Sequence, residues 1–238
     1  MIELSLVVPA YNEEKNIVSV VNHMTTFLDI HFNNYELIVV DDGSQDQTVQ
    51  VLQTIDHTRL VIHPLGTNQG KGQAIKEGMA LARGKYCFFT DADLPYPLSS
   101  LTDAIKEFKN HQCDLVIGSR HHDQDHEKDY PLLRKIMSKV FSLYTGLILN
   151  LGITDTQCGF KGFTHQAKET IFPLVTIKGF GFDVEMLFIA KNRNYVIKTI
   201  PVNMTYTEDS KVNVIKDSLK MFWDTLRVRV NQLKKKYK

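Results

Sequence analysis

Residues 35–48, YELIVVDDGSQDQT, contain the unit from which the fold can be read. The apolar run YELIVV has the length and the β-branched content of a buried strand. It ends at Asp41 and Asp42 in a turn-like composition, and Asp46 then predicts the N-cap of a helix. A buried strand followed by a polar turn and a helix is typical of a parallel sheet covered by helices.

The same alternation continues along the chain, and it predicts an α/β fold with a mainly parallel central sheet and helices on both faces. The expected strands are residues 4–8, 35–40, 60–62, 86–90 and 115–119, and the expected helices include 13–27, 70–82 and 98–109.

The composition is that of an ordinary globular protein. The chain has 238 residues, of which 43% are hydrophobic and 23% charged, so it can bury a sizeable core. Its three cysteines are an odd number without metal-ligand spacing, which predicts reduced thiols. The first residues lack a basic segment and a long apolar stretch, so we expect no signal peptide and a cytoplasmic protein.

Charge is distributed unevenly along the chain. Residues 211–238 hold nine Lys or Arg and two Asp, whereas residues 1–210 are net acidic. This disfavours a nucleic-acid binder and favours a basic tail that meets an anionic membrane surface, with a solvated terminus as the alternative. We therefore expect a catalytic domain at 1–210 and a dependent amphipathic helix at 211–238, whose apolar stripe is Ile215, Leu219, Phe222, Leu226, Val230, Leu233 and Tyr237.

A second apolar stretch, residues 140–153, contains no charged residue. A helix of this length covers about 21 Å, short of the roughly 30 Å of a hydrocarbon core. It is expected to be either a buried helix or an interfacial one, so the sequence predicts a peripheral protein with no transmembrane helix.

Polar residues follow several of the expected strands, at the sheet edge where open α/β proteins bind ligands. Asp91 and Asp93 come directly after YCFFT and, in extended backbone, point to the same side. Two such carboxylates suit Mg²⁺ or Mn²⁺ bridged to a diphosphate, although Asp pairs also occur in turns.

Two common nucleotide sites are disfavoured. GTNQGKG at residues 66–72 lacks the spacing of a P-loop, and no GxGxxG motif is present. A helix that begins at Gly70, with Lys71 beside it, could still attract an anion.

Together these motifs resemble family 2 glycosyltransferases of GT-A fold. The broad family is indicated by VVPAYNEE (7–14), VVDDGSQDQT (39–48), NQGKGQAIKEGMALARGKY (68–86), TDADLPYP (90–97) and DLVIGSR (114–120). The branch of dolichyl-phosphate β-glucosyltransferases and polyprenyl-phosphate glycosyltransferases is indicated by TDTQCGFKGF (154–163), GFDVEML (181–187), SKV (210–212) and MFWDTLRVR (221–229).

This resemblance implies the reaction and its metal. An inverting enzyme would move a sugar, with glucose the best candidate, from a UDP-sugar to undecaprenyl or dolichyl phosphate at the cytoplasmic face of a membrane. Asp91 and Asp93 would hold Mg²⁺ or Mn²⁺ on the diphosphate, with Pro95 standing where relatives often carry a Gln ligand. The implied donor-binding residues are Pro9, Ala10, Tyr11, Glu13, Asp41 or Asp42, Lys71, Asp91, Ala92 and Lys211.

The acceptor side is the more open question. By resemblance, Arg120, Arg134 and Ser138 bind the lipid phosphate, which needs no base because it is already anionic. Asp183 would then orient basic groups; it would be a general base if the acceptor were a glycan or teichoic-acid hydroxyl. A non-catalytic binding module is a third hypothesis, disfavoured by the intact Asp91 and Asp93 pair. The oligomeric state is not predicted.

Overall fold

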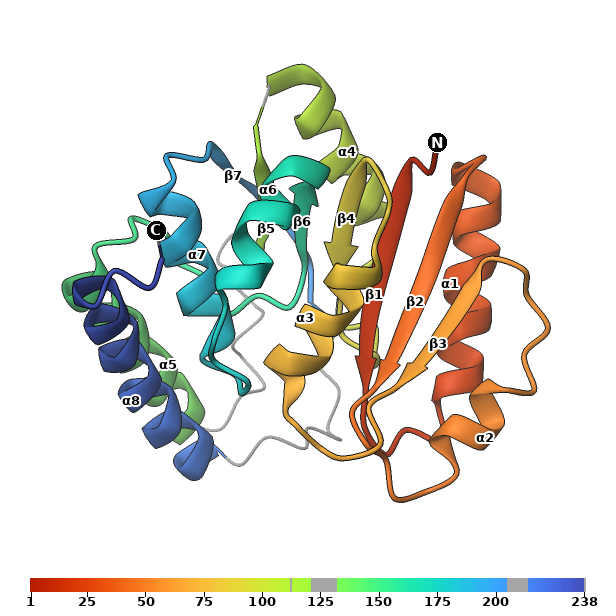
Figure 1. Cartoon of the computed structure of the whole chain (residues 1–238), viewed down its shortest axis with the longest axis horizontal. Coiled ribbons are helices and arrows are strands. Elements are labelled where there is room, and N and C mark those ends of the chain that lie inside the picture. Colours follow the sequence, from red (N-terminus) through yellow and green to blue (C-terminus); the bar gives the residue numbers. More distant parts are fainter. Residues whose placement is uncertain (112, 121–131, 205–213, 238) are drawn as a thin grey trace.

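The chain folds around one seven-stranded sheet with strand order β3-β2-β1-β4-β6-β5-β7 (Figure 1). The structure, a computed structural model, describes residues 1–111, 113–120, 132–204 and 214–237. Within these ranges it describes the backbone but not the side chains of residues 111, 132–136, 138–139 and 214–217. The strands are β1 (Leu4–Ala10), β2 (Tyr35–Asp41), β3 (Leu60–Pro64), β4 (Tyr86–Phe89), β5 (Leu115–Ser119), β6 (Lys161–Thr164) and β7 (Ile197–Pro201).

The sheet is mainly parallel, as predicted. Strand β1 pairs in parallel with β2 and β4, β2 pairs with β3, and β5 pairs with β7. Strand β6 runs antiparallel between β4 and β5. The sequence did not predict β6 or β7, so the half of the sheet beyond β4 was incomplete in the prediction.

Helices cover both faces of the sheet, which confirms the expected α/β layers. Leu6 and Val8 of β1 share a core with α1 and α4, whereas Val7 points to the opposite face and packs with α3 and α7. The helices are α1 (Ile17–His31), α2 (Thr48–Leu52), α3 (Lys71–Leu81), α4 (Ser99–His111), α5 (Leu132–Leu149), α6 (His165–Ile171), the 3₁₀ turn η2 (Phe172–Leu174), α7 (Phe182–Asn192) and α8 (Val214–Leu233).

The basic tail forms α8, which lies along α5 and α7 (Figure 1). Phe222 packs on Phe141 and Tyr144, with ring centroids 5.5 and 4.7 Å apart, and Tyr237 beyond the helix is buried. Ile215 falls in the part of α8 whose side chains are not described. The predicted stripe therefore divides, because its other members are exposed: Leu219, Leu226, Val230 and Leu233.

The end of the chain is fastened to α7 by buried hydrogen bonds. The Tyr237 hydroxyl donates to Glu185 Oε1 (2.6 Å), and Glu185 Oε2 accepts from the amides of Thr176 and Ile177 (2.7 Å each). The domain boundary expected at residue 210 lies outside the described residues. None of the described helices is long and apolar enough to cross a membrane.

Candidate active site

The carboxyl ends of β1 and β2 carry two loops that are hydrogen-bonded to each other. The Asn12 amide donates to Ser44 Oγ (2.8 Å), and the Gln45 amide donates to Asn12 Oδ1 (2.8 Å). Asn12 adopts a φ of 54°, a left-handed conformation that Asn tolerates better than most residues. These bonds fix the segment that contains the predicted nucleoside residues Pro9, Ala10, Tyr11 and Glu13.

Asp41 and Asp42 are both buried, and each already holds backbone in place. Asp41 Oδ2 accepts from the amides of Gly43 and Ser44 at 3.1 and 3.0 Å. Asp42 accepts from the amides of Gln69 (2.7 Å) and Gly70 (2.8 Å), and burial raises its pKa despite these bonds. Asp41 therefore closes the turn after β2, and Asp42 ties this turn to the loop that begins α3.

Lys71, in the first turn of α3, forms an ion pair with Asp91 at the end of β4. Burial disfavours the Lys71 cation, but Asp91, Asp183 and Asp93 outweigh this effect and raise its pKa. Gly159 lies against the same carboxylate, because a Cβ there would stand 2.0 Å from Asp91 Oδ2. The structure thus brings four of the predicted site residues, Lys71, Asp91, Asp93 and Asp183, close enough to interact, and it places Gly159 of the motif TDTQCG against Asp91.

The residues at the end of β4 fit a divalent cation. Asp91 is partly buried and Asp93 is exposed, and both offer the oxygen ligands that Mg²⁺ and Mn²⁺ prefer. No cluster of three or more His, Cys, Asp or Glu with metal-binding geometry occurs among the residues that the structure describes. Mg²⁺ is commonly held in this way, by one or two carboxylates together with the phosphate oxygens of a substrate.

Asp183, at the start of α7, is paired with a lysine that the sequence did not single out. Lys161 of β6 is fully buried, and its Nζ lies 2.6 Å from Asp183 Oδ1 and also donates to the carbonyl of Cys158. Burial raises the pKa of Asp183, although Lys161 and Lys71 oppose the rise. A carboxylate held in this way orients a buried cation.

Arg120, immediately after β5, is held by a second residue that sequence reasoning missed. Its Nε and Nη2 donate to Asp155 Oδ2 and Oδ1 at 2.8 and 2.7 Å, and its backbone amide adds a 2.9 Å bond to Oδ2. Burial alone would raise the pKa of Asp155, but Arg120 outweighs it and lowers the pKa to about 2. The guanidinium is thereby fixed in one orientation.

Other predicted residues are placed less completely. Arg134 and Ser138 lie one turn apart on α5, as expected of residues that share a face, but their side chains are not described. Lys211 lies outside the described residues. Ala92 and Pro95 lie in the segment between β4 and α4, next to Asp91 and Asp93.

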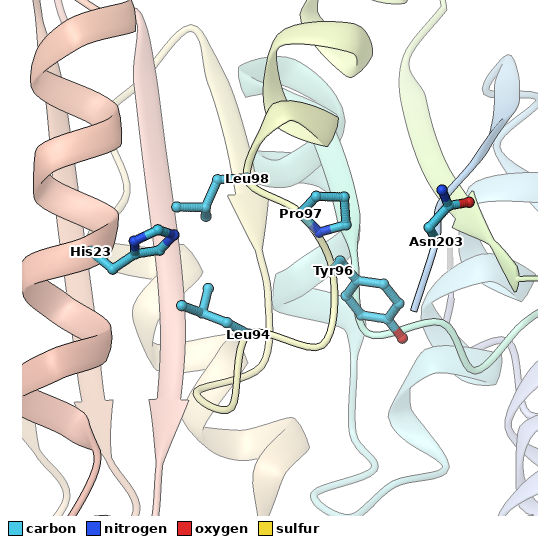
Figure 2. Close-up of a pocket in the computed structure, with 6 residues that line it drawn as sticks. All are labelled: His23, Leu94, Tyr96, Pro97, Leu98 and Asn203. Carbon is cyan, nitrogen blue, oxygen red and sulfur yellow. The ribbon is translucent and has the colours of Figure 1, made fainter. Parts of the chain in front are cut away.

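Two hollows flank this region. The larger, about 320 Å³, lies between α1 and the segment before α4, and none of the predicted site residues lines it; Figure 2 shows its lining of His23, Leu94, Tyr96, Pro97, Leu98 and Asn203. The smaller, about 180 Å³, adjoins Lys71 and is lined by Asn68, Gly70, Lys71, Gly179, Phe180, Lys220, Met221 and Asp224.

Comparison with known proteins identifies the family. Residues 5–172 match the model of glycosyl transferase family 2. The chain belongs to this family. The glycosyltransferase is 35% identical to the dolichyl-phosphate β-glucosyltransferase of Dictyostelium discoideum, over 98% of this chain and 75% of that protein. It is 33% identical to the human protein of the same name, over 97% of this chain and 76% of that protein. The branch indicated by the motifs is therefore confirmed.

The fold is shared with solved glycosyltransferases. Glucosyl-3-phosphoglycerate synthase from Mycobacterium tuberculosis, in complex with Mn²⁺, UDP and glucosyl-3-phosphoglycerate, superposes with a TM-score of 0.67 and 17% identity over 95% of this chain and 79% of its own. Mannosyl-3-phosphoglycerate synthase from Rubrobacter xylanophilus gives a TM-score of 0.71 and 15% identity over 98% of this chain and 74% of its own. The glycosyltransferase thus has the expected GT-A fold.

Proposed function

We propose that this glycosyltransferase moves glucose, with inversion, from UDP-glucose to a polyprenyl phosphate at the cytoplasmic face of a membrane. The observation that carries the proposal is its similarity, over nearly the whole chain, to dolichyl-phosphate β-glucosyltransferases. The site agrees with this reaction, since Lys71 and Asp91 meet at the carboxyl edge of the sheet beside the Lys161 and Asp183 pair.

The donor side of the proposal rests on the residues at the ends of β1, β2 and β4. The two hydrogen-bonded loops would cradle the nucleoside, and the amino-terminal turn of α3 with Lys71 would face the diphosphate. Asp91 and Asp93 would hold Mg²⁺ or Mn²⁺, which when bound offsets the negative charge of the departing UDP. Lys71 already approaches Asp91, so a cationic group stands where this charge would develop.

The acceptor side rests on Arg120 and on α5. Asp155 fixes the guanidinium plane of Arg120 at the end of β5, and Arg134 and Ser138 would bind the same phosphate from the first turns of α5. A phosphate nucleophile is ionised at neutral pH and needs no proton removed. The pairing of Asp183 with Lys161 supports an orienting role for this carboxylate.

The membrane side rests on exposed apolar residues of α5 and α8, two helices that pack together. We define this outer row as Val140, Leu143, Leu147, Leu219, Trp223, Leu226, Val230 and Leu233, all exposed. On each helix the members recur at intervals of three or four residues, so they share a face. Basic side chains on α8 and just after it, such as Lys220, Arg227 and Lys234, are exposed as well and would attract anionic lipid headgroups.

The test is direct transfer to lipid. Purified protein is mixed with radiolabelled UDP-glucose, Mn²⁺ and undecaprenyl or dolichyl phosphate in vesicles, and both label in the lipid and release of UDP are measured. We expect equal amounts of labelled lipid and UDP, with no transfer when the lipid phosphate is replaced by the free polyprenol. Glucose transferred instead to a free sugar or glycan hydroxyl would contradict the proposed acceptor.

A further inference from the structure

The smaller hollow, between the start of α3 and α8, is lined by a buried acidic side chain that the predicted site does not include. Asp224 of α8 is 8% exposed, and its Oδ2 has no hydrogen-bond partner among the residues that the structure describes. A buried polar atom without a partner lowers stability, so it calls for an explanation, and a bound ligand is one. The same carboxylate lines the hollow, which makes a ligand the natural partner.

The contact between α8 and α7 depends on Gly181. A Cβ at Gly181 would lie 2.6 Å from Asp224 Cβ and 2.7 Å from its Oδ2, so only glycine allows the helix to come this close. Gly181 directly precedes α7 and lies two residues before Asp183. The carboxylate of α8 is thus set against the segment that carries the predicted acceptor-side acid.

The hollow also adjoins the predicted donor site. Lys71 lines it and, at the same time, forms the ion pair with Asp91. A diphosphate held at Asp91 and Lys71 would therefore adjoin this hollow. One phosphate of the donor carries the nucleoside and the other the sugar, so a nucleoside placed at the ends of β1 and β2 leaves the glucosyl unit as the part of the donor that can reach Asp224.

The Asp224 side of the hollow suits a neutral polyol better than an anion, whereas Gly70 and Lys71 line the side of the predicted diphosphate site. A carboxylate accepts hydrogen bonds from hydroxyl groups but repels a phosphate, while Lys220 and Asn68 can donate to ring and hydroxyl oxygens. Phe180 and Met221 give apolar surface for the C–H face of a sugar ring. The volume of about 180 Å³ is below the roughly 300–1,000 Å³ of pockets for drug-sized ligands, which suits a single ring.

We infer that this hollow receives the glucosyl group of the donor, with Asp224 as a specificity-determining residue that accepts hydrogen bonds from the sugar hydroxyls and Lys220 as a second contact. The inference rests on the proposed function for the identity of the donor, and it extends the donor site onto α8. Because α8 also packs on α5, the sugar would lie between the diphosphate and the helix that carries Arg134 and Ser138.

The experiment compares donor and product on the same variants. The affinities of UDP-glucose and of UDP are measured by calorimetry with Mn²⁺ for the whole chain, its Asp224→Asn variant and its Lys220→Met variant. Because the variant loses a hydrogen bond to a charged group, Asp224→Asn should lower the affinity for UDP-glucose by about 10- to 100-fold and leave the affinity for UDP unchanged. Lys220→Met, at an exposed position, should lower the affinity for UDP-glucose by a smaller factor and have no effect on folding.

Asp103→Asn on the exposed surface of α4 is the matched control and should change neither affinity. If Asp224 only serves the packing of α8, Asp224→Asn will alter the melting temperature while both ligands bind as before, and the inference is overturned. Donor binding that depends on Asp224, without transfer to polyprenyl phosphate, would overturn the proposed acceptor alone; failure to bind UDP-glucose would overturn both.

Discussion

Lys161 and Asp183 form a buried ion pair, with Nζ 2.6 Å from Oδ1, that joins the antiparallel strand β6 to the first turn of α7. Lys161 Nζ also donates to the carbonyl of Cys158 and lies 5.5 Å from the centre of the Phe89 ring. The pair lies close enough to Lys71 for Asp183 to raise the pKa of that lysine. The pair therefore contacts the core at Phe89 and interacts electrostatically with Lys71 at the predicted diphosphate site.

Lys161→Met should destabilise the protein strongly, because it leaves the Asp183 carboxylate buried without its cation. Breaking such a pair on one side costs about 3–5 kcal/mol, whereas replacing both partners costs much less. The free energy of unfolding in urea should therefore fall by this amount in Lys161→Met and recover in part in the double variant Lys161→Met, Asp183→Leu. A double variant no more stable than the single one would show that the two residues do not act as a pair.

Asp155 should make stability depend on pH in the acid range. Its pKa is about 2 in the folded protein and about 3.9 when unfolded, so the folded state binds fewer protons and stability is gained as pH rises. The contribution, about 2 kcal/mol, is complete above pH 5 and is lost as pH falls through 4 towards 2.

Urea unfolding of wild type and Asp155→Asn at pH 6, 4 and 3 measures this contribution. The variant should be less stable at every pH, since Arg120 loses its partner, but the difference from wild type should shrink as pH falls. The exposed control Asp103→Asn should keep the pH dependence of the wild type. If the difference in stability between wild type and Asp155→Asn were the same at every pH, the pKa of Asp155 would not be lowered in the folded protein.

Sequence patterns predicted the parts of this fold in which local signals agree. The runs before Asp41 and Asp91 are long, apolar and β-branched or aromatic, and they form β2 and β4. Strand β6 reads KGFT, with a lysine and a glycine in four residues, so no periodicity identifies it. Its lysine is buried only because Asp183, 22 residues later, neutralises it, and such a long-range pairing leaves no local trace.

The candidate site was predictable to a similar extent. The carboxylates after β2 and β4 follow from strand ends. Asp155 and Asp224 lie in two motifs that indicate the family branch, but neither motif shows that Asp155 pairs with Arg120 or that Asp224 is buried beside Gly181, because these contacts depend on distant segments. The spacing of apolar residues predicted a single stripe on the tail, and the structure divides it. Its division between Phe222, which packs on α5, and Leu226, which is exposed, depends on where α5 lies and could not come from the tail itself.

Asp91→Asn should lower turnover by orders of magnitude while the fold remains intact. The carboxylate lies at a strand end and is partly exposed, so it contributes little to the core, whereas a bound divalent cation depends on its charge. Turnover is measured with saturating Mn²⁺, and folding is checked by thermal unfolding. EDTA should abolish wild-type activity and Mg²⁺ or Mn²⁺ should restore it; full activity in EDTA would contradict a metal at this site.

Arg134→Ala should impair use of the acceptor and leave binding of the donor intact. Charge-assisted hydrogen bonds to phosphate contribute about 1.5–3 kcal/mol, so KM for lipid phosphate should rise, or kcat should fall, by about 10- to 100-fold. The affinity for UDP-glucose should scarcely change. Arg59→Ala, which removes a partly exposed arginine paired with Asp29, is the matched control and should leave the acceptor kinetics as they are. A silent Arg134→Ala together with an inactive but folded Asp183→Asn would favour a hydroxyl acceptor.

The proposed membrane surface is best tested by point variants of the outer row. Deleting residues 213–238 would also remove Tyr237 and the α8 residues that pack on α5, so loss of vesicle binding could not be separated from loss of fold. Trp223 is 72% exposed on α8 and can be changed without disturbing that contact. Trp223→Ser and Leu226→Ser should each lower binding to anionic vesicles several-fold, because less apolar surface enters the bilayer interface.

Salt then separates the two forces in this binding. High salt should weaken vesicle binding of the wild type and of the Trp223→Ser variant by similar factors, because both keep the basic side chains that attract the headgroups. Cosedimentation with vesicles of graded anionic lipid at low and high salt measures both effects. The exposed Ile30 of α1 provides the matched control, since Ile30→Ser removes an apolar side chain far from α8 in the chain and should bind as the wild type does. Equal losses in Ile30→Ser and Trp223→Ser would contradict the assignment of the outer row as the membrane-facing surface.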